Sequence, residues 1–286
     1  MNILSIQSWV TYGHVGNASA VFPLQRLGAE VWAINTVQFS NHTGYGHWTG
    51  DVFSGTQVRA LVDGIEARGV FPRCDGVLTG YVGDAGIGAA ILDAVGRVRA
   101  ANPRAVWCCD PVIGDDRDGI YVRPGIAEML RERMLPACDI ATPNRFEIEL
   151  LAGAACRTLA AAKATVTQIA AMMRSGGPRC VLLTSLRTES TPDDAIDMLV
   201  SEAGRFHLLR TPLLPVDVNG AGDAIAALFL FHRLHSGSEV VALEAAGAAI
   251  HGLLRHTAAA GSAEILTVAA QEEFVAPGMK FLAEPC

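Results

Sequence analysis

Short apolar runs alternate along the chain with longer stretches in which apolar residues recur at helical spacing. The short runs lack strict alternation of apolar and polar positions, which predicts strands that are buried on both faces. Strands that alternate with helices predict an α/β fold with a mostly parallel sheet between helical layers. The candidate strands are residues 3–6, 31–37, 76–81, 105–112, 140–143 and 180–185.

The pattern changes toward the C-terminus. Residues 195–209 contain two apolar runs on either side of Glu202-Ala-Gly, which predicts a hairpin, and we place it at the sheet edge. Only helical patterns follow Asp223, so we expect the sheet to end before that residue and two helices, reaching Leu234 and spanning residues 238–256, to close the fold.

An alanine-rich stretch at residues 159–173 predicts a further helix, ended by Gly176-Gly177-Pro178. No internal repeat or low-complexity linker divides the chain. We therefore expect one domain over residues 1–286.

Composition and charge narrow the class of protein. Hydrophobic residues make up 50% and charged residues 18% of the chain, which is typical of a globular protein. The apolar stretches are shorter than the ~20 residues that span a bilayer, and no basic segment precedes the first of them. A net charge of -7 without a dense Lys/Arg cluster argues against nucleic-acid binding. A small phosphorylated ligand stays possible, because backbone amides at a helix start bind phosphate.

Seven cysteines, with no C-x-x-C pair, favour reduced thiols and a cytoplasmic location. Cys108, Cys109 and Cys180 lie in predicted strands, where we expect them to act as small apolar core residues.

The string GAGD at residues 220–223 directly precedes an apolar helical run. Gly220 and Gly222 leave room for a ligand to approach the backbone, and the amides of the following helix favour an anion. Asp223 beside such an anion site could accept the proton of an alcohol that attacks a bound phosphate. The alternative is that Asp223 is merely the N-cap of the helix after a tight turn.

Polar residues also follow three predicted strands, and ligands of open parallel sheets bind outside the carboxyl ends of strands. Asp110 ends one strand and suits a metal or phosphate site, although it could simply begin a turn before Pro111. Asn144 and Glu147 could form a capping box, or Glu147 could join Asp110 at Mg²⁺, which needs only one or two carboxylates. Hydroxyls at the end of a third strand could bond nucleotide phosphates or belong to a turn; they are Thr184 and Ser185.

Two loops contain glycines, and four histidines lie in the C-terminal helical stretches. The spacing G-x-x-G at residues 13–16 differs from the dinucleotide fingerprint G-x-G-x-x-G and argues against a dehydrogenase. Residues 35–50 are polar, aromatic and glycine-containing, which is typical of a mobile binding loop over an aromatic substrate. The histidines at 232, 235, 251 and 256 lack the H-E-x-x-H spacing of a zinc site.

Several short strings follow one another along the chain: SIQS, GHVGN, FPLQRLG, NTVQFSNHTGYGHWTG, LTGY, CDPVIGD, TPNRFE, LLTS and GAGD. In their order and spacing they resemble the pyridoxal kinase family, the vitamin B6 kinases of the ribokinase-like superfamily, from residue 3 to about residue 256. The resemblance implies a three-layer α/β/α fold. It also implies an enzyme that uses ATP to phosphorylate the 5′-hydroxyl of pyridoxal, pyridoxine or pyridoxamine, assisted by Mg²⁺ and often K⁺. It also suggests a homodimer.

The resemblance assigns roles residue by residue. Asp223 would activate the hydroxyl, while the amides of Gly220, Ala221 and Gly222 would hold charge on the transferred phosphoryl group. Asp110 and Glu147 would hold Mg²⁺ through water. Residues expected at the vitamer are Ser8, Val15, Thr43, Gly44, His47, Tyr81 and Asp223. Residues expected at the nucleotide are Asp110, Asp115, Tyr121, Thr142, Asn144, Glu147, Thr184, Ser185, Gly220 and Gly222.

This sequence departs from the family pattern at two points. Trp9 follows Ser8 where family members commonly carry His, which could alter ring stacking, and Ala221 lacks the hydroxyl of a threonine found in others. The proline-rich residues 211–218 could contact adenine, but the sequence assigns none of them. Two alternatives stay open: a kinase for hydroxymethylpyrimidine, and a B6-binding protein without transfer activity.

Overall fold

The computed structural model describes residues 1–286, and its centre is a ten-stranded sheet in the order β12-β11-β10-β9-β8-β5-β4-β1-β2-β3. All six predicted strands are present and pair in parallel with their neighbours. They are β1 (Asn2–Val10), β2 (Glu30–Phe39), β4 (Gly76–Thr79), β5 (Val106–Cys109), β8 (Ile140–Ala141) and β9 (Cys180–Leu186).

Antiparallel strands flank this parallel centre on both sides. The predicted hairpin is confirmed as β10 (Ala195–Glu202) and β11 (Arg205–Pro212), with β10 antiparallel to β9. The expectation that the sheet ends before Asp223 is wrong, because β12 (Glu284–Pro285) pairs outside β11. A strand of two residues is too short to have an apolar pattern that could be recognised in the sequence. On the opposite edge, β3 (Gly50–Val52) pairs with β2.

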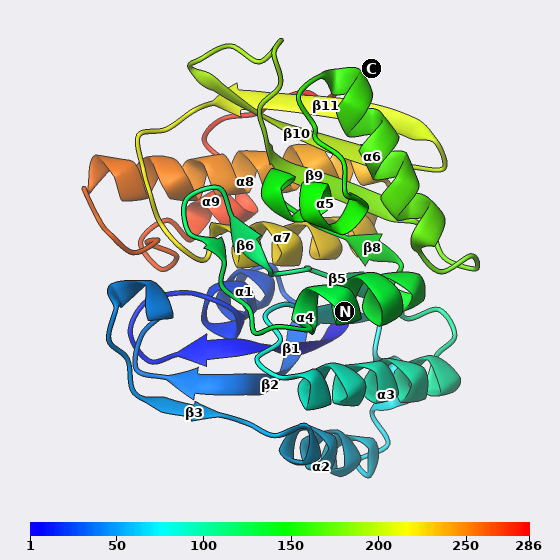
Figure 1. Cartoon of the computed structure of the whole chain (residues 1–286). Helices are drawn as coiled ribbons and strands as arrows, with labels where there is room; N and C mark the ends of the chain where they lie inside the picture. Colours follow the sequence, from blue (N-terminus) through cyan, green and yellow to red (C-terminus); the bar gives the residue numbers. More distant parts are fainter.

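Helices cover both faces of the sheet and form the three layers that the sequence predicted (Figure 1). Strand side chains alternate between two apolar clusters, so that Cys108 packs on one face and Cys109 on the other. One face carries α1 (Asn17–Arg26), α7 (Ala221–Ser236), α8 (Glu239–Ala259) and α9 (Glu272–Val275). The other face carries α2 (Gly55–Glu66), α3 (Ala85–Ala101), α4 (Ile126–Met129), α5 (Arg145–Ala152) and α6 (Leu159–Met172).

The cysteines of the parallel strands are buried core residues, as the sequence predicted. Cys108, Cys109 and Cys180 are fully buried, and all seven cysteines are free.

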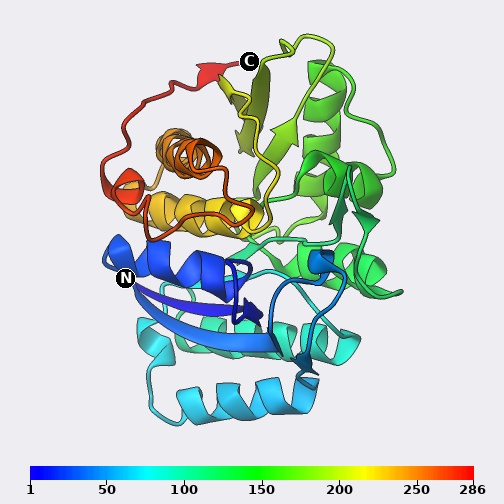
Figure 2. The ribbon, with the colours of Figure 1, turned by 90° about the vertical axis from the view of Figure 1, so that its left-hand side faces the viewer.

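On the first face, α7 packs between α1 and α8 (Figure 2). The helix predicted at residues 159–173 is confirmed as α6, as are the two helices after Asp223. No helix is both long and apolar enough to cross a membrane.

Short elements that the sequence pattern did not predict lie between the main ones. β6 (Gly114–Asp115) and β7 (Gly119–Ile120) form a separate hairpin after β5. The segment expected to be one long loop at residues 35–50 instead begins inside β2, and its centre folds into the 3₁₀ turn η1 (Thr43–Tyr45). The remaining short turns are η2 (Phe71–Arg73), η3 (Leu130–Met134) and η4 (Leu135–Ala137).

Candidate active site

The first turn of α7 is built on two glycines with different surroundings. Gly220 is the N-cap residue with φ of +85°, and a Cβ at this position would lie 1.7 Å from the carbonyl oxygen of His14. Only glycine fits there. A Cβ on Gly222 would have no atom within 4 Å, so the backbone here is open to a ligand. Asp223 is the third residue of α7, and the alternative that it is the N-cap is therefore wrong.

The loop between β1 and α1 closes over Asp223. Burial raises the pKa of Asp223 to about 6, and the N–H of Gly16 opposes this rise by hydrogen bonding to the carboxylate. A Cβ on Gly16 would lie 2.3 Å from both the carbonyl and hydroxyl oxygens of Ser8. Gly16 thus brings Ser8 close to Asp223, a role that sequence reasoning missed. The signal in the sequence is the second glycine of GHVGN, the string that directly precedes α1.

Asp110, Glu147 and Asp223 lie together although they come from separate parts of the chain. Burial raises the pKa of Asp110 well above its usual range, and repulsion from Glu147 and Asp223 adds to the rise. The Thr142 hydroxyl donates to Oδ1 of Asp110 at 2.7 Å and acts in the opposite direction. No basic side chain offsets the repulsion within this cluster.

Glu147 also has the capping role that the sequence allowed. The Asn144 side chain accepts from the N–H of Glu147 at 2.9 Å, and Oε2 of Glu147 accepts from the N–H of Asn144 at 2.9 Å. Its other oxygen accepts from the N–H of Ile113 at 2.9 Å. Burial nevertheless raises the pKa of Glu147. The capping box therefore holds a buried carboxylate beside Asp110.

The β6–β7 hairpin lies next to this acidic cluster. Asn144 donates from Nδ2 to the carbonyl oxygen of Gly114 at 2.9 Å, which ties the hairpin to the start of α5. Asp115 shapes the hairpin turn, since its Oδ1 accepts from the N–H groups of Arg117 and Asp118 at 3.0 and 2.7 Å. Tyr121 directly follows this hairpin, and its side chain is exposed. Asp115 and Tyr121 thus lie beside the acidic cluster, and their contact with the nucleotide stays a prediction.

A pocket of about 190 Å³ opens on the other side of Gly222. Two residues of β9 lie opposite one residue of β10 here, and this bulge leaves Ser185 with φ of +52° and an exposed hydroxyl. A bulge re-aims side chains, and backbone strain of this kind concentrates at functional sites. The residues lining the pocket are Thr184, Ser185, Ile196, Met198, Thr211, Pro212, Leu213, Leu214, Val216, Ala221, Gly222, Ile225, Ile250, His251 and Leu254. The sequence assigned none of the residues in 211–218 that line it.

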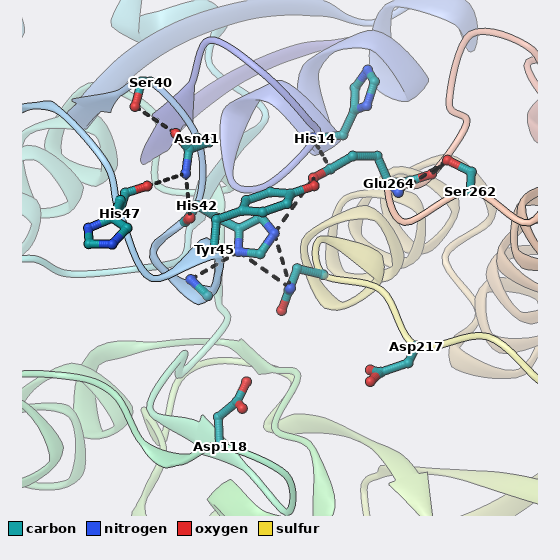
Figure 3. A network of polar contacts seen from close by, with 12 residues as sticks. His14, Ser40, Asn41, His42, Tyr45, His47, Asp118, Asp217, Ser262 and Glu264 are labelled. Atoms are coloured by element: carbon teal, nitrogen blue, oxygen red, sulfur yellow. Dashed lines mark hydrogen bonds and ion pairs between the residues drawn. The ribbon is translucent and has the colours of Figure 1, made fainter.

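The residues expected at the vitamer divide into two groups. Val15 and Tyr81 pack against a small apolar cluster beneath the site, and Ser8 lies on β1 close by. Thr43 and His47 are exposed on the loop between β2 and β3. Figure 3 shows the His47 ring pointing away from Tyr45 and His42, while its carbonyl oxygen accepts from Asn41 at 2.9 Å. Gly44 lies in η1 on the same loop.

Comparison with known proteins identifies the family. Residues 40–267 match the family model described as phosphomethylpyrimidine kinase. The chain is 65% identical, over the full length of both proteins, to a protein of Granulibacter bethesdensis named pyridoxal kinase PdxY. It is 54% identical to the protein of that name from Deinococcus radiodurans, with 99% of this chain and 96% of the relative covered.

Solved structures give the same result. Pyridoxal kinase from Leishmania donovani, in complex with ADP and pyridoxamine, superposes with a TM-score of 0.92 at 30% identity, covering 100% of this chain and 99% of the other. The ribokinase-like fold that the resemblance implied is confirmed by this match. On the strength of the matched motifs, the full-length relatives and the shared fold, the chain belongs to the pyridoxal kinase family.

Proposed function

We propose that this chain transfers the γ-phosphoryl group of ATP to the 5′-hydroxyl of pyridoxal, pyridoxine or pyridoxamine. The observation that carries the proposal is the first turn of α7, where Asp223 lies beside the open backbone of Gly222. With a pKa of about 6, Asp223 is mainly ionised at neutral pH and can accept a proton. The relatives named pyridoxal kinase support the choice of acceptor.

In the transfer, a bond forms between the 5′-oxygen and the γ-phosphorus, and the bond from that phosphorus to the β–γ bridging oxygen breaks. Asp223 takes the proton of the hydroxyl, and ADP leaves. The amides of Gly220, Ala221 and Gly222 hold the negative charge on the transferred group, since N–H groups at a helix start point toward an anion. The transition state is loose, so positioning and charge stabilisation supply most of the catalysis.

On the nucleotide side, the apolar pocket of Leu213, Leu214 and Val216 suits the base. The Thr184 and Ser185 hydroxyls at the β9 bulge are placed for phosphate contacts. Asp115, Tyr121, Thr142 and Asn144 frame the opposite side through the β6–β7 hairpin and the start of α5. On the acceptor side we assign Ser8, Val15, Thr43, Gly44, His47 and Tyr81.

Asp110 and Glu147 would hold Mg²⁺. These two carboxylates suit a metal ion because they are buried, have raised pKa values and lack a basic partner. A cation from outside the protein would neutralise their charge. No three acidic, histidine or cysteine side chains lie close enough together to chelate an ion, so water and phosphate oxygens would complete the shell. Bound there, Mg²⁺ would neutralise charge on the phosphate oxygens. Dependence on K⁺ stays a prediction from the resemblance.

Two further expectations accompany this proposal. We expect a homodimer, as the resemblance suggests. Six of the seven free thiols are buried and none is paired, which supports a reducing compartment such as the cytoplasm.

The test is ATP-dependent phosphorylation with Mg²⁺ of pyridoxal, pyridoxine, pyridoxamine and hydroxymethylpyrimidine, each offered to the wild type and to Asp223→Asn. Losing a positioned base lowers turnover by roughly 10² to 10⁴-fold. We expect that fall in the variant, with ATP affinity nearly unchanged. In the wild type, kcat should rise with pH through about 6, because only ionised Asp223 accepts the proton.

Three results would contradict the proposal in different ways. Preferred transfer to hydroxymethylpyrimidine would show that the chain is a kinase for that alcohol and not for the B6 vitamers. Binding of B6 vitamers without transfer would indicate a carrier protein. Unchanged turnover in Asp223→Asn would remove the role of this residue while leaving the reaction.

A further inference from the structure

The buried carboxylate of Glu264 joins segments that lie far apart in the sequence (Figure 3). Glu264 follows α8 and is 8% exposed. The Tyr45 hydroxyl donates to its Oε1 at 2.6 Å, and the N–H of His14 donates to its Oε2 at 3.2 Å. Nε2 of His42 lies 3.6 Å from Oε1. One side chain thus contacts the β2–β3 loop and the β1–α1 loop together.

The position of Glu264 is fixed from its own side as well. The N–H of Glu264 donates to the Ser262 hydroxyl at 3.1 Å, and that hydroxyl donates to the Glu264 carbonyl at 2.7 Å. A Cβ on Gly13 would lie 2.3 Å from Oε2 of Glu264, so the carboxylate fills space that only a glycine leaves. Glu264 is therefore a fixed point for the loops that contact it.

His42 and Tyr45 flank the segment to which acceptor binding is assigned. Thr43 and Gly44 lie between them, in η1. Nδ1 of His42 accepts from the N–H of Gly44 at 3.2 Å. A neutral imidazole then carries its proton on Nε2, which faces Glu264. Glu264 therefore bonds to the last residue of η1 and lies 3.6 Å from the residue that caps its start.

The network also reaches the turn that carries the base. Nδ2 of Asn219 lies 3.5 Å from Nδ1 of His42, which is the accepting nitrogen in this tautomer, and Asn219 directly precedes Gly220. The carbonyl oxygen of His14 packs on Gly220, while the N–H of His14 binds Glu264. The acceptor loop and the first turn of α7 therefore share a common set of contacts.

We propose that Glu264 is a positioning residue for the phosphoryl acceptor: through Tyr45 and His42 it holds Thr43 and Gly44 against the turn that carries Asp223. The proposal deepens the proposed function and rests on it for the identity of the acceptor. Glu264 does not line the nucleotide pocket, so its loss should change the KM for the acceptor much more than the KM for ATP.

Steady-state kinetics test this separation. In Glu264→Ala, the KM for the B6 vitamer should rise roughly 10- to 100-fold, since a charge-assisted bond and a second contact are lost, while the KM for ATP stays within about twofold. Tyr45→Phe removes only the hydroxyl and should raise the vitamer KM by roughly 3- to 10-fold. Glu264→Gln keeps one oxygen for Tyr45 and should fall between the wild type and Glu264→Ala.

Glu272→Gln is the matched control. It removes a carboxylate from the same C-terminal segment, but Glu272 pairs at the surface with Arg26 at 2.9 Å, away from the site. Its two KM values should match those of the wild type. A vitamer KM raised equally in this control would overturn the proposal, because a general charge effect would then explain the result.

Hydrogen exchange of the ligand-free protein gives a readout that does not require activity. The N–H groups of Tyr45 and Gly46 bond within η1, and they should exchange faster in both Glu264→Ala and Tyr45→Phe. Unchanged exchange together with an unchanged vitamer KM would overturn the proposal, as would equal rises in both KM values with a general loss of stability. If the wild type phosphorylates no acceptor, the proposed function is wrong. The hydrogen-exchange rates of Tyr45 and Gly46 would then still show whether Glu264 holds η1 in place. Tyr45 is 44% exposed, so its variant decides the matter if Glu264→Ala does not fold.

Discussion

At the scale of single residues, Gly220 and Gly222 require glycine for opposite reasons. The protein itself excludes a side chain at Gly220, where φ is +85° and the His14 carbonyl occupies the Cβ position. At Gly222 no protein atom opposes a side chain. The requirement there comes from the phosphate that the proposed function places against the backbone.

The same substitution at these two residues should therefore have different effects. Gly220→Ala should lower the free energy of unfolding by at least about 2 kcal/mol and lower activity with it. Gly222→Ala should leave stability within about 1 kcal/mol, since alanine suits a helix, yet lower kcat/KM for ATP strongly. Thermal unfolding and steady-state kinetics on both variants check this. Full activity in Gly222→Ala would contradict close approach of the phosphate.

At the scale of elements, the start of α5 combines a structural and a functional role. Its capping box of Asn144 and Glu147 satisfies the N–H groups at the first turn of the helix, and Asn144 also holds the β6–β7 hairpin through the Gly114 carbonyl. A helix cap is a local sequence feature, but its bond to the hairpin joins residues 30 positions apart. Loss of the cap should therefore be felt beyond the helix.

Two N-cap variants separate these roles. Asn144→Ala should lower the free energy of unfolding by roughly 1–2 kcal/mol and raise the KM for ATP, because the hairpin and Glu147 lose their support. Thr158→Ala removes the cap of α6, where Thr158 accepts from the N–H of Ala161 at 3.1 Å. It should cost about 1 kcal/mol without changing the KM for ATP. Equal KM values in the two variants would limit Asn144 to a capping role.

At the scale of the whole molecule, the acidic cluster of Asp110, Glu147 and Asp223 lowers the free energy of unfolding when its carboxyl groups are ionised. A carboxyl whose pKa is higher in the folded than in the unfolded chain favours folding at low pH, and stability falls as pH rises through that interval. For Asp223 the interval runs from about 4 to about 6, and the raised pKa values of Asp110 and Glu147 extend it upward.

Thermal unfolding should therefore show a lower Tm at pH 8 than at pH 6. Asp110→Asn keeps an oxygen for the Thr142 hydroxyl and removes one buried charge, so its Tm at pH 8 should be higher than that of the wild type by roughly 3–6 °C. Mg²⁺ should raise the Tm of the wild type at pH 8 more than that of the variant.

Asp197→Asn is the contrasting control for a buried aspartate. Asp197 is 1% exposed and is paired with Arg210 at 2.7 Å, so loss of its charge should lower the Tm. If Asp110→Asn lowered the Tm at pH 8 to the same degree, the repulsion within the acidic cluster would not limit stability.

The sequence by itself determined the elements with strong apolar patterns and the short motifs with a local meaning. All six parallel strands, the β10–β11 hairpin, α6 and the capping box of α5 could be predicted, because apolar periodicity and capping depend on residues near one another in the chain. The placement of that hairpin at the sheet edge was wrong, since β12 pairs outside it. The motif strings also determined the family, and with it the role offered for Asp223.

Only the tertiary structure decided how distant segments meet. The bulge that exposes Ser185, the apolar wall of Leu213, Leu214 and Val216, and the approach of Gly16 to Asp223 depend on pairing and packing across the fold. The contact of Glu264 with Tyr45 joins residues 219 positions apart, and no local pattern marks either partner. Such contacts arise because the parallel sheet gathers its loops at one edge, whereas a sequence read along the chain shows only neighbours.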